Sequence, residues 1–380
     1  DVATDARPEQ VGELFNRSHQ VGEAFGVTLV RMWGQTIEVA TFRTDGDYSD
    51  ARRPDAVQFS TAEEDARRRD FTINGLFEDP RSGEVIDYVG GLRDLERKVL
   101  RAIGDPETRI REDRLRMLRA VRFAARFGLA IEEGTQEAIR AWSMRLEGVS
   151  RERIGQELRL MLEHPNRAVA AWELSYLGLD GPVLLEESRL NAPVRIGRLP
   201  AESPYPTVLA AWALDRALGP PDEGQKGRAG APVEGRSLPD WTELVDRWRR
   251  VLMLSNDETR GLRETLARYA SAWEAWPLLG VSARKRMAVE KAFKEALLLI
   301  RAESPRDFVR ICRDISELSK TESGLAPAPL VTGDDLIEAG MKPGPMFGRL
   351  LDAVYDAQLE DELTTSQEAI ELARRLAEGW

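Results

Sequence analysis

The sequence predicts a mixed α and β region over about the first hundred residues, followed by a region that is helical throughout. Two strand-like runs, 26–33 and 35–43, are separated by Gly34, as expected for paired strands. From about residue 105 onward, apolar residues recur at spacings of three and four, and Gly and Pro separate the segments. A chain of 380 residues is long enough for two to four domains.

The composition excludes several classes of protein. Hydrophobic residues make up 42% and the formal charge is −11, which excludes collagen-like and wholly disordered chains. The single cysteine, Cys312, excludes an internal disulfide framework and favours the reducing cytoplasm. No apolar run approaches the roughly 18 residues of a membrane span. The acidic balance argues against a uniformly basic coat that binds nucleic acid but allows a local basic groove.

Periodicity locates the elements in order along the chain. Pro8 suits the first turn of a helix, and Val11, Leu14 and Phe15 then share one face. In the run 35–43, Ile37, Val39 and Thr41 alternate with Glu38, Ala40 and Phe42. Further strand candidates are 71–77 and 84–89, and the helix candidates are 115–127, 136–146, 152–162, 242–253, 260–276, 285–300 and 347–358. The polar stretch 44–54 predicts a loop, and the segment 219–240, rich in Gly and Pro, predicts an insertion or linker.

A first cluster of candidate site residues is the run 67–74. Arg67, Arg68, Arg69 and Asp70 lead into an apolar segment that ends at Asn74. The guanidinium groups suit a triphosphate, and the Asp70 carboxylate suits a ribose hydroxyl. The alternative is a solvated charge run that the acids at 63–65 balance.

A second cluster is the segment 109–126, which carries seven arginines and two acids. On a helix, Arg116, Arg119, Arg122 and Arg126 form one stripe. Such a stripe indicates a polyanion, or else a surface helix that pairs with acids of a neighbouring element.

Within the same helix, Asp113 and Arg116 are three residues apart and are therefore expected to be neighbours. An acceptor beside a donor matches the pairing edges of cytosine and adenine, whereas uracil and guanine present the opposite order. A fixed pair of this kind therefore favours C and A over U and G.

A third set consists of two acids, Asp1 and Glu38. Phosphoryl transfer with two metal ions needs carboxylates that converge on Mg²⁺ from neighbouring strands. Taken alone, a strand residue such as Glu38 is more often a solvent-facing residue than a metal ligand. Neither His19 nor His164 has a partner at metal-ligand spacing, and no phosphate-binding Gly-rich loop is present.

Taken together, these motifs resemble the class II tRNA nucleotidyltransferase and bacterial poly(A) polymerase family. The segments that carry the resemblance are 1–11, 37–43, 68–74, 87–95, 112–116 and 152–158, and in the C-terminal part 333–336 and 340–345. Six motifs in order favour the functional interpretation of the charged residues over the solvated one. The loop 44–54 resembles the flexible loop of CCA-adding members.

The resemblance implies a fold and a division of the chain. The fold is an α+β nucleotidyltransferase head, with a small mixed β-sheet and helices, followed by an all-α neck, body and tail. The division is a head at 1–100, a neck with the base-selecting motif at 101–165, a body at 166–325 with the insertion near 219–240, and a tail at 326–380.

The resemblance also implies an activity, which is Mg²⁺-dependent addition of C, C and A to the 3′ end of tRNA from CTP and ATP. Asp1 and Glu38 would be catalytic, with Asp1 a metal ligand. The nucleotide-binding residues would be Arg68, Arg69, Asp70, Asn74, Asp113, Arg116, Arg119 and Arg122. Poly(A) polymerase or A-adding activity is the alternative within the family, and a non-catalytic RNA-binding protein is the alternative outside it.

The start of the sequence departs from the family pattern. The Gly-Gly-x-Val-Arg-Asp segment and the first Asp of the catalytic pair would precede Asp1. We therefore expect the 380-residue chain to be an N-terminally truncated piece of a longer protein, and to be weakly active or inactive on its own.

Overall fold

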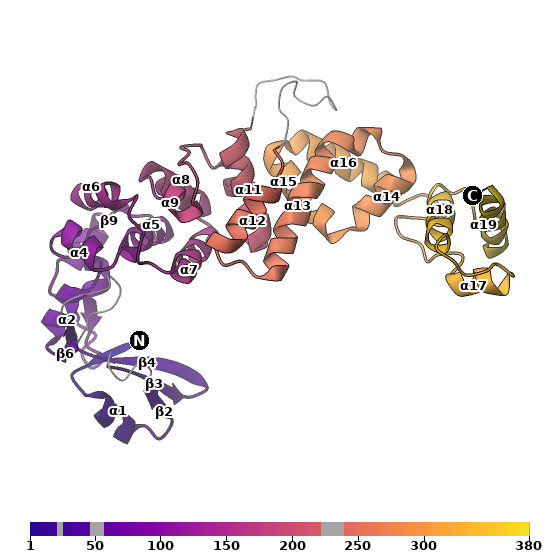
Figure 1. Cartoon of the computed structure of the whole chain (residues 1–380). Helices are drawn as coiled ribbons and strands as arrows, with labels where there is room; N and C mark the ends of the chain where they lie inside the picture. The colour runs from indigo at the N-terminus through magenta and orange to yellow at the C-terminus, as the bar shows by residue number, and fades with distance from the viewer. Residues whose placement is uncertain (21–25, 46–56, 222–238, 380) are drawn as a thin grey trace. The chain divides into compact units, whose positions relative to one another are not determined.

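The structure is a computed structural model that describes residues 1–20, 26–45, 57–221 and 239–379. The chain forms two compact units, coloured by residue number in Figure 1. The first unit contains Asp1–Pro193 and Arg247–Leu254, and the second contains Val194–Asp246 and Ser255–Trp380. Most of the predicted loop at 44–54 and of the predicted insertion at 219–240 lies outside the described residues.

The first unit begins with short strands and continues with helices. Its strands are β1 (Val2–Thr4), β2 (Ser18–Gln20), β3 (Val27–Met32), β4 (Gln35–Thr41), β5 (Arg43–Asp45), β6 (Val57–Phe59), β7 (Leu76–Glu78), β8 (Val85–Asp87), β9 (Val99–Leu100) and β10 (Ala130–Ile131). Its helices are α1 (Pro8–Leu14), α2 (Ala62–Arg68), the 3₁₀ turn η2 (Thr72–Gly75), α3 (Gly91–Glu96), α4 (Pro106–Glu112), α5 (Leu115–Phe127), α6 (Glu133–Trp142), α7 (Arg151–Leu162), α8 (Arg167–Tyr176) and α9 (Asp180–Leu184).

A four-stranded mixed sheet forms the core of the N-terminal part, in the order β1-β4-β3-β2 (Figure 1). Strand β1 pairs parallel with β4, whereas β3 pairs antiparallel with both β4 and β2. Trp33 and Gly34, with φ angles of 51° and 77°, form the two-residue turn between β3 and β4, as a hairpin turn of this length requires. This arrangement confirms the two strands and the turn predicted around Gly34.

Helix α1 packs on this sheet with only part of its predicted apolar face. Val11 is buried with Val30 and Val39, and Phe15 packs against the same cluster. Leu14 is exposed, contrary to the prediction, because the helix ends at Leu14 and Phe15 follows in an extended conformation that turns towards the sheet.

The strand predicted over 71–77 is wrong for its middle part. Phe71 makes a β-bridge to Ala102, the chain then winds into η2, and only the end of the predicted range, at Leu76 and Phe77, belongs to the short strand β7. Two side-chain hydrogen bonds account for the turn, because Thr72 donates to Asp94 at 2.8 Å and Asn74 donates to Asp70 at 2.9 Å.

The second unit is helical over its described residues. Its elements are α10 (Val194–Arg198), α11 (Tyr205–Leu218), α13 (Asn256–Ala275), η3 (Trp276–Leu278), α14 (Val281–Val289), α15 (Lys291–Glu303), α16 (Pro305–Leu318), α17 (Gly333–Glu338), α18 (Phe347–Leu359) and α19 (Ser366–Gly379). Helix α12 (Thr242–Val251) is divided between the two units. The helix predicted over 285–300 is interrupted at Glu290, whose backbone is extended and whose carboxylate accepts from Arg268.

Two features hold the second unit together. The buried Arg195 donates to Asp215 at 3.0 Å and also pairs with Glu303, and burial raises the pKa of Asp215 to about 6. The last three helices share a separate apolar core around Val331 and Leu336. Throughout the described ranges, every helix is too short or too polar to cross a membrane.

Candidate active site

The two arginines that precede Asp70 are held by an acid that the sequence analysis did not assign to the site. Helix α2 begins with a capping box at Thr61, and it places the buried carboxylate of Asp65 one turn before its end. Asp65 accepts hydrogen bonds from Arg68 Nε at 2.9 Å and from Arg69 Nη2 at 3.0 Å. Arg69 also donates to the backbone carbonyl of Asn74 at 2.7 Å. Both guanidinium groups are therefore fixed where the chain enters η2.

Asp70 connects this turn to a distant helix. Its carboxylate accepts hydrogen bonds from Asn74 Nδ2 and from the Phe71 N–H, both at 2.9 Å. It also accepts from Arg119 Nε of α5 at 2.7 Å, across 49 residues of sequence. Burial alone would raise the pKa of Asp70, but the Arg119 guanidinium and the Asn74 amide hold it below its ordinary value of 3.8. Asp70 is therefore an anion that ties the head segment to α5.

Helix α5 carries the arginine stripe, and it begins and ends where the sequence predicts. The first three arginines pair with acids of other elements, as the alternative interpretation of the stripe proposed. Arg116 donates to Glu112 at 2.6 Å and Arg122 donates to Glu157 of α7 at 2.6 Å, in addition to the Arg119–Asp70 pair. Arg126, in the last turn, is exposed. The arginines thus lie side by side and are oriented before any ligand binds.

Asp113 and Arg116 do not share one helix, which corrects the expectation that they do. Helix α4 ends at Glu112, Asp113 is extended, and α5 begins at Leu115. The chain breaks there because the Asp113 carboxylate accepts the N–H of Leu115 at 3.0 Å, which replaces a helical backbone bond. Asp113 pairs with Arg153 of α7 at 2.8 Å, whereas Arg116 turns to Glu112.

Helix α7 thus supplies two residues of the segment 152–158, to which the sequence analysis assigned no role in the site. Arg153 and Glu157 lie one helical turn apart, and they contact Asp113 and Arg122 respectively. Gly155, between them, brings α7 against the backbone of Leu252, since an added Cβ would lie 2.5 Å from the Leu252 oxygen. The signal for Arg153 and Glu157 in the sequence is that a basic and an acidic residue lie on one face of a helix. That spacing does not identify the residues that they contact.

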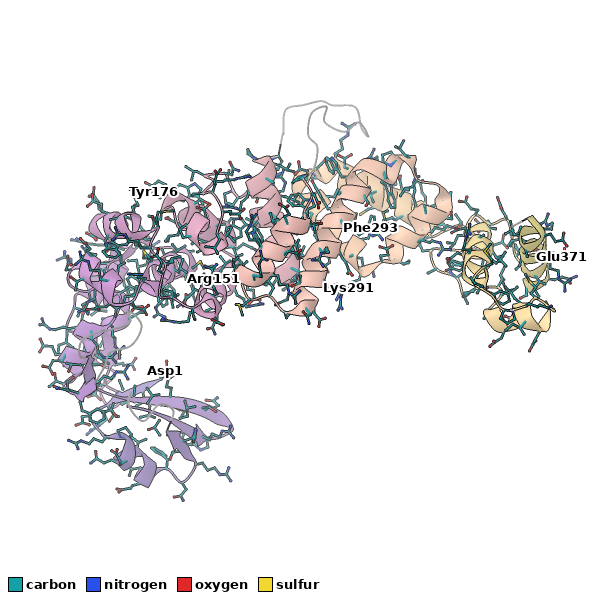
Figure 2. All side chains as sticks on the ribbon, viewed as in Figure 1. Asp1, Arg151, Tyr176, Lys291, Phe293 and Glu371 are labelled. Carbon is teal, nitrogen blue, oxygen red and sulfur yellow. The ribbon has the colours of Figure 1, made fainter. Side chains whose placement is uncertain are left out.

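Glu38 lies on β4, and Asp1 directly precedes the parallel strand β1 (Asp1 is labelled in Figure 2). Val2 of β1 is opposite Val39 of β4, so the register places the residues that precede them, Asp1 and Glu38, next to each other. Both are exposed, and neither has an ion-pair partner among the described residues. The described residues hold no group of three or more His, Cys, Asp or Glu side chains that could bind a metal ion. Mg²⁺, however, commonly uses one or two carboxylates together with substrate phosphates, so the pair fits that ion.

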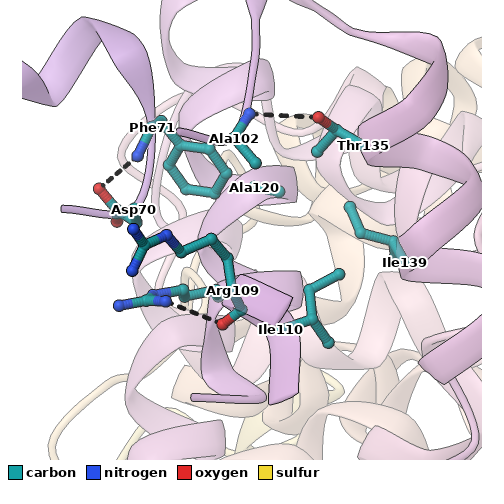
Figure 3. A pocket seen from close by; sticks show the side chains of 9 residues that line it. Asp70, Phe71, Ala102, Arg109, Ile110, Ala120, Thr135 and Ile139 are labelled. Atoms are coloured by element: carbon teal, nitrogen blue, oxygen red, sulfur yellow. Dashed lines mark hydrogen bonds between the residues drawn. The ribbon is translucent and has the colours of Figure 1, made fainter. Parts of the chain in front are cut away.

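Asp70 and Arg116 line a small cavity, and Figure 3 shows it with Asp70 labelled. Its other lining residues include Phe71, Arg109 and Thr135, and its volume is about 10 Å³. That volume is about what one water molecule needs, so the cavity cannot hold a nucleotide.

The small mixed sheet, the acids on its parallel strands and the helix-borne arginines are the parts of a nucleotidyltransferase. Three family models match the chain: "Poly A polymerase head domain" at residues 1–101, "Probable RNA and SrmB- binding site of polymerase A" at 128–184, and "tRNA nucleotidyltransferase domain 2 putative" at 254–373. Both the predicted resemblance and the predicted fold class are confirmed.

Known proteins are similar over almost the whole chain. The CCA-adding enzyme of Geobacillus kaustophilus is 34% identical over 377 residues, which cover 97% of this chain and 86% of the relative. That of Enterococcus faecalis is 46% identical over 376 residues, which cover 97% and 85%. The crystal structure of Bacillus stearothermophilus CCA-adding enzyme in complex with CTP matches at 27% identity with a TM-score of 0.72, covering 99% of this chain and 88% of that one. This chain belongs to the CCA-adding enzyme family.

Proposed function

We propose that this protein adds C, C and A to the 3′ end of tRNA, without a nucleic-acid template, from CTP and ATP. Family membership over nearly the full chain supports this activity. The observation that carries the proposal is the 2.7 Å hydrogen bond between Arg119 and Asp70. It joins the segment expected to hold the sugar and triphosphate to the helix expected to select the base, so that one nucleotide can touch both.

The phosphates and the sugar are assigned to the rigid part of this network. Arg68, Arg69 and Arg119 would bind the triphosphate, because guanidinium groups match phosphate oxygens in a bidentate manner, and Arg122 would support them indirectly. Asp70 and Asn74 would position the ribose. Arg122 is nearly buried by its pair with Glu157, so its contribution would act through the field of its charge and through its support of Arg119.

Base choice is assigned to Asp113 and Arg116. An acceptor and a donor that both reach one base would match cytosine and adenine and leave buried groups unpaired with uracil and guanine. In the structure the two side chains pair with Arg153 and Glu112 respectively, so this reading needs them to face the base together when the nucleotide binds. Arg153 fixes the direction of the Asp113 carboxylate through the 2.8 Å hydrogen bond. Arg116 is restrained by Glu112, so both reading groups have a fixed orientation.

Asp1 and Glu38 would hold Mg²⁺. When bound, the ion would neutralise charge on the triphosphate and make the primer hydroxyl more acidic. The 3′-hydroxyl of the primer forms the new bond to the α-phosphorus, and pyrophosphate leaves.

A cytoplasmic location is part of the proposal. The family model that matches residues 1–101 is described as a poly A polymerase head domain, which favours the alternative of poly(A) synthesis. The resemblance of segment 44–54 to the loop of CCA-adding enzymes favours CCA addition.

The test uses a tRNA transcript that ends before CCA, with Mg²⁺ and each nucleotide supplied separately and together. It is run with the 380-residue chain and with the chain preceded by the Gly-Gly-x-Val-Arg-Asp segment of the family. Ordered addition of C, C and A supports the proposal. Long A tails would assign poly(A) synthesis instead, and RNA binding without incorporation by either protein would assign a non-catalytic role.

A variant pair makes the same test specific for the base-selecting residues. Arg116→Ala should relax the preference for CTP over UTP more than it weakens tRNA binding. Arg260→Ala is the matched control, because Arg260 is exposed and pairs with Asp257 in the second unit. Unchanged selectivity in Arg116→Ala would remove the base-reading role.

A further inference from the structure

An aromatic ring that the proposed activity does not use lies beside one of the arginines assigned to the triphosphate. Phe77 belongs to β7, and the guanidinium of Arg69 lies over its ring, 4.6 Å from the ring centre. Arg69 precedes η2 and Phe77 follows it, so the contact joins the two sides of the turn that carries Asn74. An aromatic face attracts a cation through its quadrupole, so Phe77 directs Arg69 without neutralising its charge.

The hydrogen bonds of Arg69 leave two of its N–H groups for a ligand. Nε and Nη2 donate to the Asp65 carboxylate at 3.2 and 3.0 Å, and Nη1 donates to the carbonyl of Asn74 at 2.7 Å. A guanidinium group has five N–H donors, so one on Nη1 and one on Nη2 remain beyond these bonds to described residues. The Arg69 side chain is 29% exposed, so a phosphate can reach it. The direction of the two remaining N–H groups therefore decides where a phosphate binds.

The position of Phe77 is in turn set by the sheet that carries the candidate metal ligands. Its ring meets the ring of Phe42 edge to face, with centres 5.6 Å apart and planes 84° apart. Phe42 directly follows β4, and its N–H donates to the carbonyl of Thr4 at 2.7 Å, so the chain still runs beside β1. Side chains alternate along a strand, which puts Phe42 on the same face as Glu38. Glu38 and Arg69 are thus tied to one strand, Glu38 directly and Arg69 through two aromatic rings.

A second contact joins Arg69 to the same end of β4. Arg43, the residue after Phe42, donates its backbone N–H to the Asp65 carboxylate at 3.3 Å, and Asp65 is the acid that holds Arg69. This contact uses a main-chain N–H and a carboxylate, so it does not depend on the Phe77 ring. The contribution of the ring can therefore be measured separately from that of the ion pair.

We propose that Phe77 is a positioning residue for the triphosphate. It acts through Arg69, whose two remaining N–H groups it holds in a fixed place relative to Asp1 and Glu38. Phosphate oxygens that bind Arg69 are thereby placed with respect to these acids. An aliphatic side chain would fill the same space but has no quadrupole to attract the cation. The proposal rests on the assignment of Arg69 to the triphosphate in the proposed function.

The experiment measures the affinity of the full chain for CTP and for cytidine by equilibrium binding in the presence of Mg²⁺. Phe77→Leu and Phe77→Met keep an apolar side chain without the ring. Each should weaken CTP binding about 2- to 30-fold, the range for a cation–π contact. Each should change the affinity for cytidine by less than about twofold, because cytidine has no phosphate to contact Arg69. Phe77→Tyr keeps the aromatic face and should bind CTP within about twofold of the unsubstituted chain.

A double variant tests whether Phe77 acts through Arg69. Arg69→Ala alone should weaken CTP binding. Adding Phe77→Leu to Arg69→Ala should weaken it by less than about twofold more, since the group on which the ring acts is already absent. Phe308→Leu is the matched control, because Arg301 lies over the Phe308 ring at 5.8 Å in the second unit. That variant should bind CTP as the unsubstituted chain does.

The outcomes distinguish this inference from the proposed function. Unchanged CTP affinity in Phe77→Leu, together with a loss in Arg69→Ala, would overturn the positioning role alone. So would equal losses for CTP and cytidine, a loss in Phe77→Tyr as large as that in Phe77→Leu, or an undiminished loss in the Arg69→Ala background. If Arg69→Ala itself leaves CTP affinity unchanged, the assignment of Arg69 to the triphosphate fails, and the role of Phe77 fails with it.

Discussion

The ion pair between Arg122 and Glu157 allows the sharpest test of how the site is built. The two side chains are 10% and 9% exposed, and Nε lies 2.6 Å from Oε2. Glu157→Leu leaves the Arg122 guanidinium desolvated without its carboxylate, and breaking a buried pair in this way costs ~3–5 kcal/mol. The second contact of Glu157, to Arg119 at 3.9 Å, adds little because Arg119 keeps Asp70 as its partner. We therefore expect a loss of about 3–5 kcal/mol in the unfolding free energy of the first unit.

A double variant separates the loss of the pair from the loss of packing. Arg122→Met together with Glu157→Leu replaces both charges by apolar groups, a change that is often neutral or stabilising. The double variant should therefore be more stable than Glu157→Leu alone. Glu157→Gln keeps an oxygen acceptor, and we expect it to cost only ~1–3 kcal/mol.

The assay is chemical denaturation followed by tryptophan fluorescence and by circular dichroism. Glu163→Leu is the control, because Glu163 follows α7 and forms an exposed pair with Arg159. That variant should change stability by no more than ~1 kcal/mol. Two outcomes would refute the reasoning. The first is that Glu157→Leu unfolds at the same denaturant concentration as the control. The second is that the double variant loses as much unfolding free energy as Arg122→Met and Glu157→Leu lose together when measured separately.

Three further predictions concern the same region. Arg153→Met should free the Asp113 carboxylate and lower the preference for CTP over UTP in equilibrium binding about tenfold, because a charged hydrogen bond is worth ~1.5–3 kcal/mol. Gly155→Ala should destabilise the first unit by ~1–3 kcal/mol in denaturation, since its Cβ would overlap the Leu252 carbonyl. Asp70, with its lowered pKa, contributes stability that is present above its ordinary pKa of 3.8 and is lost as the pH falls through the lowered value. Asp70→Asn should therefore flatten the fall in unfolding free energy that the unsubstituted chain shows as the pH drops below about 3.8.

Each of these predictions has its own counter-result. Equal CTP and UTP selectivity in Arg153→Met and the unsubstituted chain would show that Asp113 needs no orienting partner. Gly348→Ala, at a helical glycine with open space around it, should be neutral or stabilising, so a matching loss in both glycine variants would contradict the packing argument. An unchanged acid slope in Asp70→Asn would mean that another carboxylate governs the acid transition.

The sequence by itself determined the elements whose signals are local. Helix α5 runs from Leu115 to Phe127 as its apolar period predicts, and the β3–β4 hairpin follows from alternation on both sides of Gly34. The arginine stripe likewise depends only on helical spacing. Ordered motifs along the chain were sufficient to identify the family, because their order does not depend on knowing which side chains touch.

Only the tertiary structure decided which charges pair. Asp113 contacts Arg153 across 40 residues, and Asp70 contacts Arg119 across 49, so neither pair is visible as a spacing. Contacts with other elements also explain the two errors in predicted secondary structure. At 71–77 Thr72 donates a hydrogen bond to Asp94, and at the break in the helix predicted over 285–300 Glu290 accepts one from Arg268. An ion pair between separate elements forms only when packing brings them within about 3 Å. The packing of distant apolar faces, rather than the charged residues themselves, therefore sets the geometry of this site.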